Sequence, residues 1–253
     1  MLARRRLLPI AFLPLAPHAW AEEVLAAVAA NFAAPIELIA QDFERASGHR
    51  VQVSLGASGA LYAQIRYGAP FELMLSADTT IPLQLVEEGL AVADSRFTYA
   101  RGRLVLWSAD PQRVDGSDRV LRDGRFSRLA IANPRVAPYG MAARAVLDGL
   151  NMAFDDTHTL LQGESISQTY QFVATGNAEL GFVALSQVWQ DGKLRAGSAW
   201  IVPQTLHPAI DQDAVLLERG RDRPAARAFL AFLRSDAART RIAAFGYEVP
   251  KDD

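Results

Sequence analysis

The hydrophobic pattern of this chain alternates between short continuous apolar runs and longer stretches with the apolar spacing of a helix. A continuous apolar run at residues 24–30 precedes residues 33–47, in which Ile36, Ile39 and Phe43 recur at helical spacing on one face. The same change of period returns several times downstream. Short apolar strands that alternate with amphipathic helices are typical of an α/β fold with largely parallel sheets.

The pattern and its turn residues predict where these elements lie. Strands are expected at residues 24–30, 51–55, 71–75, 103–107, 128–132 and 180–184. Helices are expected at residues 33–47, 59–67, 80–88, 141–150, 168–175 and 224–234, and a last one runs from a cap at Ser235-Asp236 to Gly246.

Each of the first two strands runs into a turn of small residues that opens a helix. Asn31 and Ser58 stand where helix N-caps belong. Backbone N–H groups at a helix start have no intrahelical partner and lie at the positive end of the helix dipole. They can therefore hold an anion without a charged side chain. Several such starts around one cleft would make a receptor for a small oxyanion.

The first 21 residues have the composition of a secretory signal peptide. Arg4-Arg5-Arg6 precedes an apolar stretch at residues 7–15, and Ala19-Trp20-Ala21 supplies a small-x-small cleavage site. No later stretch approaches the roughly 20 apolar residues that span a bilayer. We therefore expect cleavage after Ala21 and a soluble mature protein in the periplasm.

Charge and cysteine content exclude several classes of function. Removing the three arginines of the leader from 26 basic residues leaves 23 against 28 acidic residues, a net charge of −5. This balance does not suit a nucleic-acid surface. The chain has no cysteine, which excludes thiolate zinc sites, cysteine nucleophiles and a lipid anchor after the leader. No His/Asp/Glu cluster has the spacing of metal ligands, and no cofactor is expected.

The turn at Ser58 permits an interpretation from a different class of function. Gly56-Ala57-Ser58-Gly59-Ala60 nearly matches the G-x-S-x-G elbow of α/β-hydrolases, but Ala60 replaces the last glycine. His207 follows Ser58 in the order of a catalytic triad, and no other residue supports that role. A secreted serine hydrolase is the less favoured alternative.

Short motifs follow one another in a set order over the whole mature region. They are Ala29-Ala30-Asn31-Phe32, Gly56-Ala57-Ser58-Gly59, residues 67–73 leading into Ser76-Ala77-Asp78, Asn133-Pro134 through Pro138-Tyr139-Gly140, Glu179 to Ala184, and Phe232-Leu233 to Gly246-Tyr247. Each motif alone is weak, but their order and spacing are specific. Together they resemble the periplasmic molybdate-binding proteins of ABC transporters, which are type II periplasmic solute-binding proteins.

This resemblance implies a two-lobed periplasmic-binding-protein fold with the ligand cleft between the lobes. The first lobe would comprise residues 22–102 plus 203–253, and the second lobe residues 103–202. The implied function is capture of molybdate or tungstate and delivery to the permease of an ABC transporter. Such a protein is a monomer and not an enzyme, and its molybdenum or tungsten is present only as the oxyanion.

The resemblance also implies which residues contact the oxyanion. Matched position by position, they are Asn31 and Ser58 from the first lobe and Tyr139 and Ile166 from the second, with Ile166 acting through its main chain. Many relatives have a tyrosine where this chain has Ala184, which cannot donate a hydrogen bond. We expect Tyr139 to supply the hydroxyl from another direction. An enlarged pocket at Ala184 would instead favour another tetrahedral oxyanion or a small organic acid.

Overall fold

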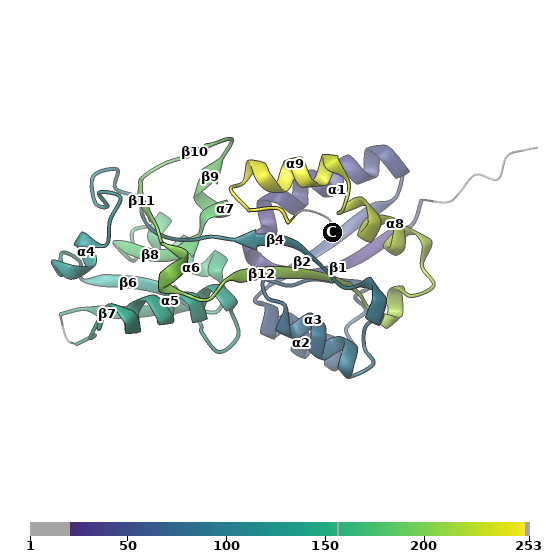
Figure 1. Cartoon of the computed structure of the whole chain (residues 1–253), viewed down its shortest axis with the longest axis horizontal. Helices are drawn as coiled ribbons and strands as arrows, with labels where there is room; N and C mark the ends of the chain where they lie inside the picture. Colours follow the sequence, from purple (N-terminus) through teal and green to yellow (C-terminus); the bar gives the residue numbers. More distant parts are fainter. Residues whose placement is uncertain (1–20, 156, 251–253) are drawn as a thin grey trace, which may run out of the picture.

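The computed structural model describes residues 21–155 and 157–250. Two α/β bodies lie side by side along the long axis of the molecule (Figure 1). The predicted signal peptide lies outside the described residues except for Ala21. Within the described part of the chain, no helix combines the length and the apolar character that crossing a membrane requires.

The first body is built on a five-stranded sheet with the strand order β2-β1-β3-β12-β4. Strand β1 pairs in parallel with β2 and β3, whereas β12 pairs antiparallel with β3 and β4. The strands are β1 (Glu23–Ala29), β2 (Arg50–Gly56), β3 (Leu73–Leu75), β4 (Phe97–Gly102) and β12 (Ile210–Leu216).

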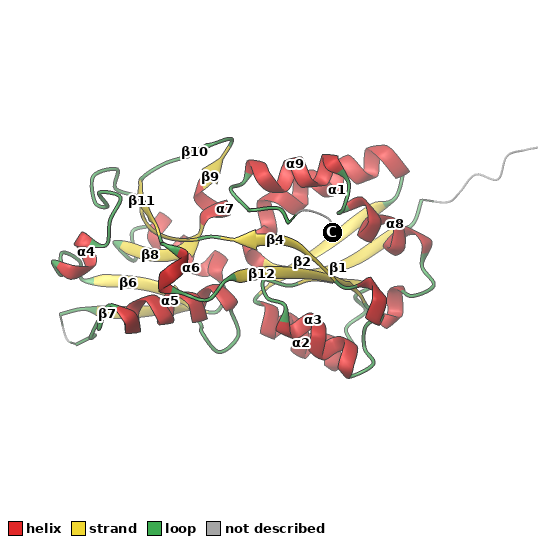
Figure 2. Cartoon of the chain, in the orientation of Figure 1, coloured by secondary structure: helices red, strands yellow, loops and turns green. Residues whose placement is uncertain are grey.

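Helices cover both faces of this first sheet (Figure 2). Val24, Ala26 and Val28 of β1 pack with α1, α8 and α9, whereas Ala27 packs with α2 and α3. This alternation is the period of two that a strand buried on both faces requires. The helices are α1 (Ala33–Ser47), α2 (Ser58–Arg66), α3 (Thr80–Glu87), α8 (Pro224–Phe232) and α9 (Asp236–Ala244).

The second body repeats this layering on a sheet with the order β11-β5-β8-β6-β7. Leu104 and Leu106 pack in the same core as α5, and Val105 and Trp107 pack with α6 and α7. The strands are β5 (Leu104–Ser108), β6 (Arg128–Ala132), β7 (Thr159–Gly163), β8 (Leu180–Ala184) and β11 (Ser198–Ile201), and the helices are α4 (Arg119–Arg122), α5 (Pro138–Gly149), α6 (Ile166–Ala174) and α7 (Leu185–Val188).

Shorter elements complete the described chain. A small ribbon of β9 and β10 lies beyond α7, and four 3-10 turns connect larger elements. They are β9 (Trp189–Gln190), β10 (Lys193–Leu194), η1 (Ala30–Phe32), η2 (Ala93–Ser95), η3 (Gln204–Leu206) and η4 (Glu218–Gly220).

The chain passes between the two sheets at two adjacent places. It leaves the first sheet at Gly102, the end of β4, and enters the second at Leu104, the start of β5. It returns between Ile201 and Ile210, and Ile210 is the partner of Gly102 in the β4–β12 pair. Two neighbouring crossings of this kind form a hinge between the bodies.

The predicted two-lobed α/β architecture is confirmed. Each sheet is mixed, because β12 in the first sheet and β5 in the second run antiparallel to their neighbours. The helix expected at 141–150 begins earlier, at Pro138, since proline fits the first position of a helix. The expected Ser235 cap is confirmed by its side chain, which accepts a bond from the Ala238 N–H. The predicted lobe limits at 102/103 and 202/203 stay a prediction.

Candidate functional site

Two pairs of parallel strands end side by side, one pair in each sheet. In the first sheet Ala29 of β1 lies opposite Gly56 of β2. In the second sheet Ala132 of β6 lies opposite Gly163 of β7. After each of these four strands the chain turns into a helix: α1, α2, α5 and α6. The region beyond the carboxyl ends of such strands is where open α/β sheets bind ligands.

The starts of α2, α5 and α6 meet at one small cavity with the 3-10 turn η1, which precedes α1. The cavity is lined by residues from both bodies. All four residues predicted from the sequence as ligand contacts line it: Asn31, Ser58, Tyr139 and Ile166. The full lining is Ala29, Ala30, Asn31, Gly56, Ala57, Ser58, Ala77, Ala137, Pro138, Tyr139 and Ile166.

Asn31 and Ser58 are not the helix N-caps, so that part of the sequence interpretation was wrong. Asn31 lies inside the 3-10 turn η1, which precedes α1 and moves its N-cap to Phe32. At the second start, Ala57 makes the extended turn and serves as N-cap, so that Ser58 is the first helical residue. Both shifts place the polar residue on the cavity without using its side chain as a cap.

The Ser58 hydroxyl is positioned to donate into the cavity. Ser58 is only 1% exposed, and its Oγ accepts a 2.9 Å hydrogen bond from the Ala77 N–H. Among the described residues it donates to no acceptor. A hydroxyl has one proton and two acceptor lone pairs, so the proton of Ser58 remains available.

The Asn31 side chain is already occupied within the protein. Its Nδ2 donates to Gln212 Oε1 at 2.9 Å and to the Tyr247 hydroxyl at 2.8 Å. A side-chain amide has two N–H donors, and both are used. The Asn31 carbonyl oxygen accepts from Ser186 Oγ at 2.8 Å. In this arrangement Asn31 can donate to a ligand only through its main-chain N–H.

The Tyr139 hydroxyl belongs to the same buried network. Tyr139 is the second residue of α5, and its hydroxyl accepts from Gln212 Nε2 at 3.1 Å. Burial raises the pKa of the Tyr99, Tyr139 and Tyr247 hydroxyls well above the ordinary value of 10, so all three are neutral at physiological pH.

Sequence reasoning missed Gln212 and Tyr247 as members of this site. The strand that holds Gln212 begins Ile210-Asp211-Gln212-Asp213, and this polar run conceals a buried strand. A signal was present in Gln212 itself, since an uncharged polar residue between two acids is compatible with an inward-facing position. Ala184, where many relatives have tyrosine, is fully buried and is not part of the cavity lining.

Direct contacts across the cavity join the two bodies. The Gly59 N–H of α2 donates to the Val136 carbonyl oxygen at 2.9 Å, and Ser167 Oγ of α6 donates to the Ala30 carbonyl oxygen at 3.3 Å. A Cβ at Gly59 would lie 3.0 Å from Val136 Cα, so only glycine permits this approach without a shift. The bodies are therefore closed on each other around the cavity.

Among the described residues, those that line the cavity carry no charge. A ligand there is surrounded instead by the starts of α2, α5 and α6 and of the turn η1, whose first N–H groups have no intrahelical acceptor. The N–H groups of Ser58, Tyr139 and Ile166 belong to these first turns. The arrangement can bind a small group that offers only acceptors.

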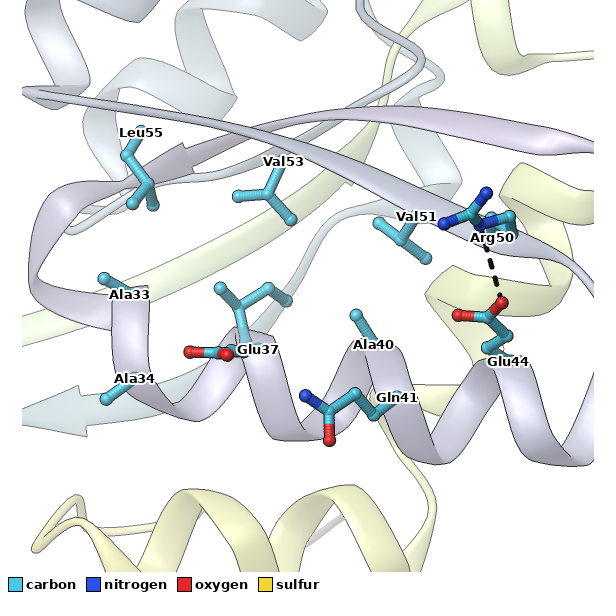
Figure 3. Close-up of a pocket in the computed structure, with 11 residues that line it drawn as sticks. Ala33, Ala34, Glu37, Ala40, Gln41, Glu44, Arg50, Val51, Val53 and Leu55 are labelled. Atoms are coloured by element: carbon cyan, nitrogen blue, oxygen red, sulfur yellow. Dashed lines mark ion pairs between the residues drawn. The ribbon is translucent and has the colours of Figure 1, made fainter.

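A much larger hollow lies elsewhere, between α1 and the edge strand β2 (Figure 3). Its floor includes Val51, Val53 and Leu55, and the Glu44–Arg50 ion pair, at 3.5 Å, crosses one end. The carboxylate of Glu37 also lines it. An apolar groove with acidic side chains on its rim does not suit an anion. The larger volume of this hollow therefore does not make it the oxyanion site.

The described residues do not support a metal centre or a hydrolase triad. No group of three or more His, Asp and Glu residues within them could hold a metal ion. His207, the histidine considered for a triad with Ser58, has Nδ1 2.8 Å from the Pro208 carbonyl oxygen, and it does not line the cavity.

Comparison with known proteins gives the class. Residues 24–248 match the family described as bacterial extracellular solute-binding protein, and the chain belongs to this family.

Within that class the similarity is close to proteins named molybdate-binding protein ModA. The relative from Azotobacter vinelandii is 54% identical, with 92% of each chain covered. The relative from Rhodobacter capsulatus is 51% identical, covering 92% of this chain and 91% of its own length. At this identity and coverage the chain is a member of the ModA family, whose members are binding proteins and not enzymes.

Solved structures agree with this assignment. The periplasmic molybdate-binding protein of Azotobacter vinelandii matches with a TM-score of 0.85 and 38% identity, over 90% of this chain and all of that one. The substrate-binding domain of a putative molybdenum ABC transporter from Clostridium difficile matches with a TM-score of 0.67 and 25% identity, over 91% of this chain.

The buried tyrosines predict a loss of stability at alkaline pH. In the unfolded chain Tyr99, Tyr139 and Tyr247 ionise near pH 10, whereas burial keeps them protonated in the folded protein. The unfolded state then binds fewer protons, so the free energy of unfolding falls as pH rises above about 10, by up to about 4 kcal/mol per pH unit for three groups. Urea unfolding at pH 9 and pH 11 measures this slope. Equal stability at both values would contradict it, and Tyr99→Phe should reduce the slope by about a third.

Proposed function

We propose that this chain captures molybdate or tungstate in the periplasm and delivers it to the permease of an ABC transporter. The observation that carries the proposal is the convergence of the starts of η1, α2, α5 and α6, two from each body, on one uncharged cavity. Its membership of the ModA family supports the choice of ligand. Asn31, Ser58, Tyr139 and Ile166 are the proposed contacts.

The chemistry of the cavity suits a tetrahedral dianion. Molybdate near neutral pH has four oxygens that only accept hydrogen bonds, and N–H and O–H donors satisfy all of them. Phosphate as HPO₄²⁻ has a proton that would face another donor, at a cost of about 1–3 kcal/mol for the unpaired group. Sulfate has no such proton, but it is smaller, and a rigid ring of donors sized for molybdate bonds it poorly.

The acidic balance of the mature chain is compatible with this ligand. Helix dipoles act within the first turn, directly on the bound group. Exposed carboxylates are screened over about 10 Å at ordinary ionic strength. The cavity itself is lined by uncharged residues, so local dipoles dominate there.

Affinity comes from closure of the two lobes, for which we keep the predicted limits of 22–102 plus 203–253 and 103–202. An anion that contacts both lobes only in the shut state shifts the population toward that state. The Gly59–Val136 and Ser167–Ala30 bonds form between the lobes in the same closed arrangement. The closed monomer is the form that the permease recognises, after export directed by the signal peptide at residues 1–21.

Oxyanions should separate clearly in a thermal-shift experiment. Molybdate and tungstate are expected to raise the melting temperature, because they bind only the folded closed protein. Equimolar sulfate and phosphate should leave it unchanged. Stabilisation by sulfate, phosphate or a small organic acid without an effect of molybdate would contradict the proposed ligand.

Removal of the Ser58 hydroxyl tests the first-lobe contact. Ser58→Ala should weaken molybdate binding by about 2 kcal/mol, the value of one hydrogen bond to a charged group, as measured by titration calorimetry. Ser76→Ala is the matched control, since Ser76 is equally buried but does not line the cavity. Equal affinities of the two variants would show that Ser58 is not a ligand contact.

A methyl group at position 59 should interfere with closure. Gly59→Ala places Cβ against Val136 across the interface, and overpacking of this kind costs about 1–3 kcal/mol. The cost arises only when the lobes are shut, so molybdate affinity should fall while the melting temperature without ligand stays near that of the wild type. Gly149→Ala, a helical glycine with open space around it, is the control. Wild-type affinity in Gly59→Ala would contradict closure on this contact.

A further inference from the structure

One wholly buried side chain behind the cavity is hydrogen-bonded to three residues of the network. Gln212 on β12 has no exposed surface. Its Oε1 accepts from Asn31 Nδ2 at 2.9 Å and from the Tyr99 hydroxyl at 3.0 Å. Its Nε2 donates to the Tyr139 hydroxyl at 3.1 Å. A side-chain amide with both ends bonded in this way is fixed in orientation.

Two of these partners line the cavity, and they come from different bodies. Asn31 belongs to the turn η1 beside the first sheet, whereas Tyr139 belongs to the start of α5 beside the second. Gln212 therefore forms a bridge of two hydrogen bonds between opposite walls of the same cavity.

The backbone at the hinge leaves room for this bridge. Gly102 pairs with Ile210 on the neighbouring strand, and a Cβ at Gly102 would lie 2.0 Å from the Tyr139 hydroxyl oxygen and 2.5 Å from Gln212 Nε2. Glycine is needed here for close approach of the two side chains. The bridge thus sits against the crossing point of the chain, where relative movement of the two bodies is smallest.

We propose that Gln212 is a positioning residue that sets the size selectivity of the oxyanion cavity by holding Asn31 and Tyr139 at a fixed separation. This inference rests on the proposed function, because it concerns the fit of the same ligand. Gln212 does not touch the anion. It keeps the turn at Asn31 and the helix start at Tyr139 from moving closer together.

The physical reason is that hydrogen bonds weaken when a donor is too far away. Sulfate differs from molybdate in size and not in its set of acceptors, so only a wall that resists inward movement rejects it. Without the bridge, the turn at Asn31 and the helix start at Tyr139 can move closer together around a smaller anion. The affinity for sulfate then falls less than the affinity for molybdate, or rises, so the affinity ratio of molybdate over sulfate falls.

The experiment measures the dissociation constants for molybdate and sulfate in Gln212→Met, which keeps the length of the side chain and removes its amide. We expect the affinity ratio of molybdate over sulfate to fall about three- to tenfold, the range that one neutral hydrogen bond supplies. Tyr139→Phe removes the same bridge from its other end, together with the interaction of its hydroxyl with Tyr247, and should lower the ratio at least as much. The double variant should lower it no further than Tyr139→Phe alone, because the bridge is already broken there.

Ser108→Ala is the control. It deletes a buried hydroxyl that donates to the Glu179 carbonyl oxygen, but Ser108 does not line the cavity and is not a hydrogen-bond partner of Gln212, Asn31 or Tyr139. Its affinity ratio should remain within about twofold of the wild type, whatever its effect on the melting temperature.

Several outcomes would overturn the inference. Equal loss of both affinities in Gln212→Met would mean that the residue supports only the fold. Multiplying losses in the double variant would mean that Gln212 and Tyr139 act independently and not through one bridge. If Gln212→Met does not fold, Tyr139→Phe against Ser108→Ala decides by the same ratio. Absence of molybdate binding in the wild type would contradict the proposed function instead, and the variants would not be needed to show it.

Discussion

Backbone N–H groups at a helix start cannot be satisfied within the helix, and the site depends on this constraint. Most proteins cover such groups with caps or water. Here Asn31 and Ser58 do not act as caps, and the starts of α2, α5 and α6 present their first residues to a common cavity. The cavity gains donors for an anion without the cost of burying a cation. The fold places these starts together because each follows a parallel strand whose carboxyl end lies at the cleft.

The site also requires that the hydrogen-bond donors of the two bodies keep fixed positions relative to each other. Gly59 lets the bodies approach at the front of the cavity, and Gly102 leaves room for the Gln212 bridge at the back. Both glycines act through close contact and not through backbone conformation. The buried tyrosines around Gln212 remain neutral, so the network behind the site keeps its donors and acceptors over the physiological pH range.

Local patterns in the sequence predicted much of this arrangement, and long-range pairing explains most of what they did not. Apolar runs such as 128–132 and 180–184 identified central strands, because strands buried on both faces are apolar throughout. Strand β12 was missed since its polar residues are buried only through partners distant in sequence, such as Arg96 with Asp213 and Asn31 with Gln212. The four cavity residues came from helix-start motifs and family resemblance. The occupation of the Asn31 amide could not be read from sequence, because its acceptors lie 181 and 216 residues away.

We conclude that uncharged donors at the starts of α2, α5 and α6 and at the turn η1 enclose one tetrahedral oxyanion. Crystals of the molybdate complex, with data collected at the molybdenum absorption edge, test it most directly. We predict one anomalous peak in the cavity bounded by Ser58, Tyr139 and Ile166, with the oxygens around it at hydrogen-bond distance from the main-chain N–H groups of these residues and from Ser58 Oγ. A peak beside an arginine, in the α1–β2 groove or anywhere outside this cavity would contradict it.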